Sequence, residues 1–122
     1  MRFLLASSSP RRAELLAAAG YVFEVKSCSV DETPLPGEIP ALYVARLAAA
    51  KADRVAETAD DCVVLGADTS VVLDGDILGK PVDDADAAKM LRRLSGRSHE
   101  VLTGVSIRYA SQRVVAVDRT VV

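Results

Sequence analysis

The stretch FLLASSSPRRAELLAAAG, residues Phe3–Gly20, joins a strand directly to a helix. The apolar run at its start is typical of a buried strand over Arg2–Ala6. Ser9 and Pro10 are residue types that favour the N-cap and the first position of a helix. The glycine at the end of the stretch is typical of the residue that follows a helix, which is expected over Arg11–Ala19. A strand that passes straight into a helix favours an α/β fold.

The rest of the chain continues this alternation of strands and helices. After the opening, the pattern predicts a strand over Val22–Ser27, a proline-rich loop over Val30–Pro40 and a helix over Ala41–Ala56. An apolar strand then starts at Cys62 and is expected to break near Gly66–Thr69, and a hairpin with a type I′ turn follows at Asp74-Gly75. The last predicted elements are a helix over Asp84–Leu94, capped by Asp83, and two paired strands around Ser111-Gln112. We therefore expect an α/β domain with a mixed, twisted sheet and flanking helices.

The chain ends on Val121-Val122, inside one of the predicted strands, without a closing helix or a polar tail. Natural domains usually cover an exposed apolar strand end. We therefore expect residues 1–122 to form a single domain that is truncated at its C-terminus, so that the natural protein is longer.

The composition excludes several classes of partner. Of the 122 residues, 50% are hydrophobic and 26% are charged, which is typical of a globular domain with a core of its own. The net charge of −2 and the aromatic content of 4% argue against nucleic acid as a partner. The sequence predicts neither a membrane span nor a signal peptide, so a cytoplasmic location is expected. Cys28 and Cys62 stand outside any disulfide or zinc pattern and are expected to be reduced thiols.

Two arginines follow Pro10, at the end of the predicted helix where the backbone is already positive. The free N–H groups of a helix N-terminus favour an anion, and the hydroxyls of Ser7–Ser9 add donors at the same place. Exposed cations there oppose the helix dipole by roughly 0.3–1 kcal/mol each, whereas a bound polyphosphate would attract both the cations and the dipole. Arg11 and Arg12 therefore predict a phosphate site, with the alternative that both side chains bend into solvent.

On the predicted helix over Ala41–Ala56, an apolar stripe is formed by Tyr43, Val44, Leu47 and Val55. Lys51 lies near the centre of this stripe, midway between Leu47 and Val55. A lysine that faces a core needs a partner, because removing its ammonium group from water is costly. We therefore expect the ammonium group of Lys51 to face a ligand. The alternative is a lysine whose amine reaches past the stripe to water.

Carboxylates supply the opposite charge. Asp68 follows a predicted buried strand, beside the small residues Gly66 and Ala67, in the region where open α/β sheets bind ligands. There it can hold a divalent metal or accept a proton from water, or it can be a turn aspartate bonded to its own backbone. Glu32 in the proline-rich loop is a second acid or a solvated loop carboxylate. Lys80, in LGKP, follows a hairpin, where a lysine is usually just exposed. It is a candidate for binding the same anion only because the other cations already need one.

Together these residues resemble one family. The segments LASSSPRRAELL, VDE, YVARLAAAKA, GADTSVV, GKP and LSGRSHEVLTGV occur in the order and spacing of the Maf family, over essentially all 122 residues. Family members are nucleoside triphosphate pyrophosphatases whose α/β fold resembles that of the inosine triphosphate pyrophosphatases. The resemblance implies hydrolysis of dTTP or UTP, or of modified pyrimidine nucleotides, to the monophosphate and pyrophosphate, with Mg²⁺ or Mn²⁺ as the cofactor. Family members commonly form homodimers, so a homodimer is also expected.

The resemblance also implies roles for individual residues. Asp68 matches the proton acceptor, and Glu32 matches the acid that joins it at the metal. The substrate-binding positions are matched by Ser7, Arg11, Arg12, Lys51, Thr69 and Lys80. In the branch that prefers dTTP and UTP, the positions of Arg11 and Thr69 influence specificity, and both residues fit that branch. Family members continue past the end of this chain into a segment that helps to recognise the base, so a nucleotide-binding module without turnover is the alternative function.

Overall fold

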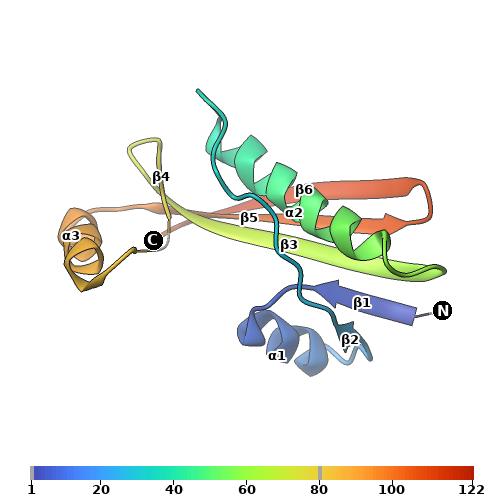
Figure 1. The fold of residues 1–122 in the computed structure, drawn as a ribbon. Coiled ribbons are helices and arrows are strands. Elements are labelled where there is room, and N and C mark those ends of the chain that lie inside the picture. Colours follow the sequence, from blue (N-terminus) through green and yellow to red (C-terminus); the bar gives the residue numbers. More distant parts are fainter. Residues whose placement is uncertain (1, 80) are drawn as a thin grey trace.

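The computed structural model describes residues 2–79 and 81–122, so Lys80, a predicted substrate ligand, lies outside the described residues. The elements alternate along the chain: β1 (Arg2–Ala6), α1 (Pro10–Ala18), β2 (Glu24–Val25), α2 (Pro40–Ala56), β3 (Cys62–Leu73), β4 (Asp76–Leu78), α3 (Asp84–Leu94), β5 (Glu100–Tyr109) and β6 (Gln112–Val121). The predicted α/β class is confirmed (Figure 1).

The described strands form one sheet with the order β2-β1-β3-β5-β6, and β4 pairs with β3 as well. β1 runs parallel to β2 and β3, whereas β3 is antiparallel to β4 and β5, and β5 is antiparallel to β6. The sheet is therefore mixed, as the sequence predicts. β1 and β4 pair with separate parts of β3, because the last β1 pair is at Gly66 and the first β4 pair is at Val71.

One long helix contributes residues to both hydrophobic clusters of the core. α2 packs across β3 and β5, and its buried residues are Tyr43, Val44, Leu47, Ala48, Ala52 and Val55. They include all four residues of the predicted apolar stripe. α1 lies beside β1 and β2, and α3 lies near β4 (Figure 1). Neither of these two helices has a buried residue. Among the residues that the structure describes, no helix is both long and apolar enough to cross a membrane.

The predicted caps and the predicted hairpin turn are confirmed. The Ser9 side chain caps α1 by accepting a hydrogen bond from the amide of Arg12, and Asp83 caps α3 in the same way. Asp74 and Gly75 have φ angles of 53° and 81°, as the two central residues of a type I′ turn require. Local sequence signals therefore determine where these elements begin and turn.

Two predictions about strands are wrong. β3 continues through the whole of Gly66–Thr69, so the expected break does not exist. The strand expected over Val22–Ser27 is reduced to Glu24–Val25, because only these two residues pair with β1. Val22 is 92% exposed, so its apolar side chain, which favoured a longer strand, takes no part in the core.

Gly66 and Gly104 let α2 lie directly on the sheet. A Cβ atom built on Gly66 would be 2.3 Å from the carbonyl oxygen of Ala48, and one built on Gly104 would be 2.3 Å from the carbonyl oxygen of Val44. Both distances are far shorter than a van der Waals contact, so a larger residue fits only if the helix moves. The two glycines therefore fix how closely α2 approaches β3 and β5.

Gly104→Ala is expected to lower the free energy of unfolding by about 1–3 kcal/mol, because the added methyl group displaces the backbone of α2. Gly79→Ala is the matched control, since a Cβ atom at Gly79 meets nothing within 4 Å. Urea titration of both variants measures the difference. Equal stability of the two would show that α2 does not rest on Gly104.

Candidate functional site

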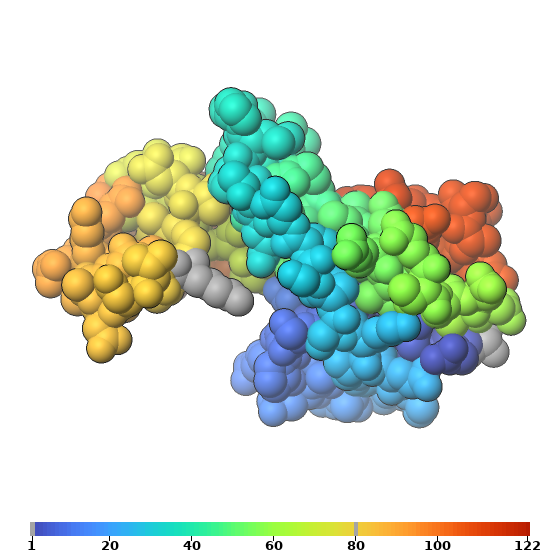
Figure 2. All heavy atoms as spheres, in the orientation of Figure 1, coloured from blue at the N-terminus to red at the C-terminus, as the bar shows by residue number. Residues whose placement is uncertain are grey.

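A gap in the pairing along one side of β3 opens into a large cavity. Among the described residues, no strand pairs with Ala67–Ser70 on the side that β1 and β4 share. A cavity of about 1340 Å³ lies at this gap, lined by the start of α1, the loop over 28–34, α2 and the β3–β4 hairpin. Figure 2 shows the surface indented between the blue N-terminal segment and the yellow segment of the hairpin. A second cavity of about 220 Å³ near the start of β3 contains none of the predicted site residues.

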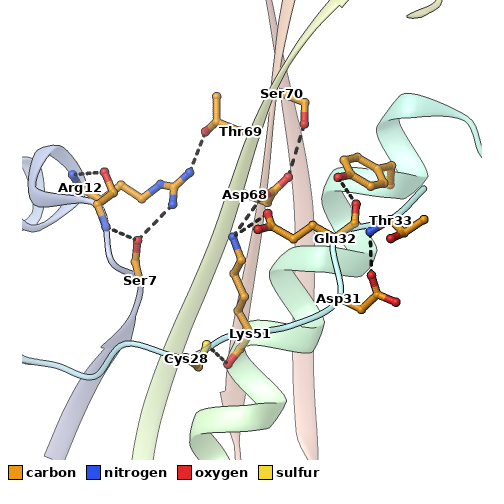
Figure 3. A network of polar contacts seen from close by, with 12 residues as sticks. Ser7, Arg12, Cys28, Asp31, Glu32, Thr33, Lys51, Asp68, Thr69 and Ser70 are labelled. Atoms are coloured by element: carbon orange, nitrogen blue, oxygen red, sulfur yellow. Dashed lines mark hydrogen bonds and ion pairs between the residues drawn. The ribbon is translucent and has the colours of Figure 1, made fainter. Parts of the chain in front are cut away.

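Lys51 and Asp68 form an ion pair in the larger cavity (Figure 3). The Lys51 Nζ atom lies 3.1 Å from Asp68 Oδ1, and the two side chains are 15% and 7% exposed. Glu32 Oε1 lies 3.8 Å from the same Nζ atom, on a side chain that is 52% exposed. The other carboxylate oxygen of Asp68 accepts a hydrogen bond of 3.5 Å from the Ser70 hydroxyl. The two buried charges compensate each other, which explains how a lysine lies in the apolar stripe of α2.

This ion pair decides between the alternatives for Lys51 and Asp68. Lys51 does not reach past the stripe to water, since its side chain is mostly buried. Asp68 is not a turn residue, and the prediction that it follows a strand is wrong, because it lies within β3 opposite Gly104. It nevertheless lies beyond the carboxyl end of β1, whose last residue, Ala6, pairs with Gly66. The acid therefore lies just beyond the end of a parallel strand, although its own strand continues.

Arg12 connects α1 to the same gap in the sheet. Its Nη1 atom donates a hydrogen bond of 3.1 Å to Ser7 Oγ, and its Nη2 atom donates one of 3.0 Å to Thr69 Oγ1. Thr69 also shares a hydrogen bond of 3.2 Å with Thr103, the residue opposite it on β5. The partners of Arg12 are neutral hydroxyls, so within residues 2–79 and 81–122 no carboxylate compensates its charge.

Arg11 lies apart from this group. Its side chain is exposed and does not line the cavity, and it has no hydrogen bond or ion pair with the rest of the described chain. Ser7, in contrast, is 4% exposed and accepts hydrogen bonds from both Arg12 and the amide of Ser9. The structure thus brings together Ser7, Arg12 and Thr69, and separately Glu32, Lys51 and Asp68, in one cavity that does not include Arg11.

Three residues beside Glu32 were not predicted from the sequence. The Tyr43 hydroxyl donates a hydrogen bond of 2.6 Å to the backbone carbonyl of Glu32, although Tyr43 was counted only as part of the apolar stripe. Burial raises the pKa of Tyr43, and the negative charges of Asp68 and Glu32 raise it further. Arg46 of α2 forms an ion pair with Glu38, which precedes the helix, with 2.7 Å between Nε and Oε2. The sequence feature that could have revealed them is the three-residue spacing of Tyr43 and Arg46, which places both side chains on the side of α2 that the loop crosses.

Cys28 is a further cavity residue that the sequence did not assign to the site. Cys28 and Cys62 are both free thiols, as expected. The Cys28 sulfur lies 3.6 Å from the backbone carbonyl of Lys51. Burial raises the pKa of the Cys28 thiol, against the smaller, opposite effects of the charges on Lys51 and Arg54. A raised pKa disfavours the thiolate, which argues against Cys28 as an activated nucleophile.

Glu32 and Asp68 are the residues that could hold a divalent cation. The described part of the chain has no group of three or more His, Cys, Asp or Glu side chains that could hold a metal ion by itself. Two carboxylates nevertheless converge on one cationic group, at 3.1 and 3.8 Å from Lys51 Nζ. Mg²⁺ is commonly bound through one or two carboxylates and completes its coordination with water and substrate phosphates. These donors fit such a cation when a phosphate ligand supplies the remaining oxygens.

Comparisons with known proteins agree on a family and a fold. A family model described as Maf-like protein matches residues 2–122. A dTTP/UTP pyrophosphatase of Geobacter sulfurreducens is 54% identical over 106 residues, which cover 87% of this chain and 56% of that protein. The dTTP/UTP pyrophosphatase of Symbiobacterium thermophilum is 51% identical over 121 residues, covering 99% of this chain and 62% of that protein. The chain thus spans little more than half the length of these curated relatives.

Solved structures with low sequence identity share the fold. A Ham1 protein of Staphylococcus aureus matches with a TM-score of 0.66 at 17% identity, over 100% of this chain and 70% of that one. A HAM1 protein of Coxiella burnetii matches with a TM-score of 0.68 at 17% identity, over 99% of this chain and 71% of that one. At this identity the likeness shows the fold alone.

Lys51→Met is expected to lower the free energy of unfolding by up to about 3 kcal/mol, because it leaves the Asp68 carboxylate buried without a counter-charge. The double variant Lys51→Met/Asp68→Asn should recover part of that loss. Urea titration of the wild type, both single variants and the double variant measures the coupling. Arg93→Met, which breaks an exposed ion pair with Asp76, is the control and should cost roughly 0–1 kcal/mol. Additive effects of the two single substitutions would contradict the pairing.

Proposed function

The chain belongs to the family of Maf-like proteins, and from this membership and the site we propose that it hydrolyses dTTP or UTP to the monophosphate and pyrophosphate. The curated relatives named for this activity support the proposal. The observation that carries it is that one cavity contains two cations, Arg12 and Lys51, beside a nearly buried acid, Asp68. A nucleotide-binding module without turnover has no observation of its own in its favour.

The triphosphate binds to the cations at the start of α1 and on α2. The first turn of α1 contains no acidic residue, so its N-terminus is free to attract an anion. Arg12 donates to neutral hydroxyls, and a phosphate oxygen is a stronger acceptor for a guanidinium group than a hydroxyl is. Lys51 lines the same cavity and adds a second positive charge. Both side chains stabilise the negative charge that develops on the pyrophosphate as it leaves.

Asp68 accepts the proton of the attacking water. Lys51 and Ser70 fix the two oxygens of its carboxylate, and the pairing of β3 with β5 holds its backbone. The water oxygen forms a new bond to phosphorus, its proton passes to Asp68, and the bond between the α- and β-phosphates breaks. A carboxylate in one orientation is suited to this role, because proton transfer requires a short, aligned contact.

Glu32 and Asp68 would hold Mg²⁺ or Mn²⁺ together with the phosphates. Such a cation supplies charge neutralisation and orients phosphate oxygens. Lys51 lies between the two carboxylates and reduces their mutual repulsion. Lys80 as a further phosphate ligand, modified pyrimidine nucleotides as substrates, a homodimer, a cytoplasmic location and the lack of a nucleic-acid partner stay predictions from the sequence.

Asp68→Asn is expected to slow the release of pyrophosphate from dTTP and UTP by roughly 10²- to 10⁴-fold, because the amide cannot accept the proton. Release is measured with Mn²⁺ present. Asp53→Asn is the matched control, since Asp53 also lies in ion pairs, with Arg108 and Arg113, but does not line the cavity. Near-normal release by Asp68→Asn would exclude an essential role, and nucleotide binding without release by the unmodified chain would support the module instead.

Arg12→Lys is expected to raise KM for dTTP by about tenfold or more, because one charge-assisted hydrogen bond contributes roughly 1.5–3 kcal/mol and an ammonium cannot span both hydroxyls and a phosphate. Arg11→Lys makes the same chemical change on a side chain that does not line the cavity. Because no hydrogen bond to the phosphate is then lost, KM should stay within about twofold of its original value. Steady-state kinetics of the two variants decide which arginine binds phosphate. A larger effect at Arg11 would restore the assignment made from the sequence.

A further inference from the structure

The loop that carries Glu32 is exposed and has little apolar contact to hold it. Every residue over 31–37 is exposed, and the segment between β2 and α2 includes Pro34 and Pro36. Prolines restrict the backbone but donate no hydrogen bonds. Val30, the first residue of the loop, packs against the core cluster that contains Tyr43 and Leu47. The position of the Glu32 carboxylate therefore depends on polar contacts made by the loop backbone.

Two side chains of α2 hold two successive carbonyl groups of the loop, those of Glu32 and Thr33. The Tyr43 hydroxyl donates to the carbonyl of Glu32 at 2.6 Å, and Arg46 Nη2 donates to the carbonyl of Thr33 at 3.2 Å. The Arg46 guanidinium carbon also lies 5.6 Å from the centre of the Tyr43 ring, within the range of a cation–π contact. Both donors come from the helix that also carries Lys51, so the loop is fixed relative to that amine.

Glu38 completes this attachment from the far end of the loop. Its carboxylate is 7% exposed and accepts two hydrogen bonds from Arg46, at 2.7 Å from Nε and 2.9 Å from Nη2. It also accepts the amide of Leu35 at 3.0 Å. The hydrogen bond from Arg46 is the main reason that the pKa of Glu38 lies below its ordinary value. Arg46 thus binds both ends of the loop, one through a carboxylate and the other through a carbonyl.

We propose that Arg46 is a positioning residue, which holds the loop so that the Glu32 carboxylate lies beside Lys51 and Asp68. The role of Glu32 rests on the proposed function; the attachment of the loop does not. Arg46 acts through the loop, since Arg46 itself does not line the cavity. A planar guanidinium group can bind a carboxylate with two parallel N–H groups and still reach a carbonyl, whereas an ammonium group cannot keep this geometry.

The first test is hydrogen exchange in Arg46→Lys, read at the amides of Thr33 and Leu35, which lie in the loop. Exchange at these amides should become at least about tenfold faster, as expected for the loss of roughly 1.4 kcal/mol of local protection. Arg108→Lys is the matched control. Arg108 also pairs with a carboxylate, Asp53 of α2, and its side chain is 31% exposed, against 34% for Arg46. Unchanged exchange in Arg46→Lys, or an equal change in Arg108→Lys, would overturn the proposal.

The second test separates positioning from stability and does not require turnover. Calorimetry measures the binding of Mn²⁺ to the chain in the presence of inorganic pyrophosphate. Arg46→Lys should weaken Mn²⁺ binding several-fold, Arg108→Lys should not, and Glu32→Gln should also weaken it. If Arg46 acts through Glu32, adding Arg46→Lys to Glu32→Gln produces no further loss.

The outcomes of the second test are distinct. Additive losses in the double variant, unchanged Mn²⁺ binding in Arg46→Lys, or no Mn²⁺ binding by the parent chain would each overturn the proposal. If the parent chain binds Mn²⁺ and pyrophosphate with the expected dependence on Arg46 but releases no pyrophosphate from dTTP or UTP, the proposed function fails and the positioning role stands.

Discussion

The close contact between α2 and two glycines of the sheet is the constraint on which the site depends. Because Gly66 and Gly104 have no side chains, the helix backbone approaches β3 and β5 closely. At this separation Lys51, on α2, reaches Asp68, on β3, with 3.1 Å between the charged atoms. Larger residues at the two glycines would hold the helix farther out and leave both charges partly desolvated without a partner. The packing of the core and the electrostatics of the site therefore come from the same contact.

The gap between β1 and β4 is the second requirement. Successive residues of a strand point to opposite faces, so Asp68 points toward α2 and Thr69 points to the other face of the sheet. Asp68 meets Lys51, while Thr69 meets Arg12 and Thr103. In a continuous sheet, a neighbouring strand would separate these two groups. Since no described strand pairs with β3 here, both groups reach one cavity.

The features that the sequence predicts well are those with a local cause. Caps, turns and the apolar stripe of α2 depend on residues a few positions apart, and they were confirmed. Gly66 was taken as the sign of a break in the strand, although its real cause is the approach of a distant helix. The misfit of Lys51 showed that it needed a partner, but the partner, 17 residues later in the chain, depends on how α2 crosses the sheet. Arg11 and Arg12 could not be told apart, because only the direction of α1 decides which of them meets Ser7.

The parts of the site differ in how firmly the fold holds them, and this difference bears on how a ligand would bind. Asp68 lies on the central strand, between α2 and β5, and is 7% exposed. Glu32 lies on an exposed loop, and Arg12 lies on a helix without a buried residue. Exposed elements with few apolar contacts open at a lower free-energy cost than a core strand does. The acid is therefore held in a fixed position, while Glu32 and Arg12 lie where a charged ligand can order them. Part of the free energy of ligand binding is then spent on ordering, so contacts that order the loop beforehand increase affinity without touching the ligand.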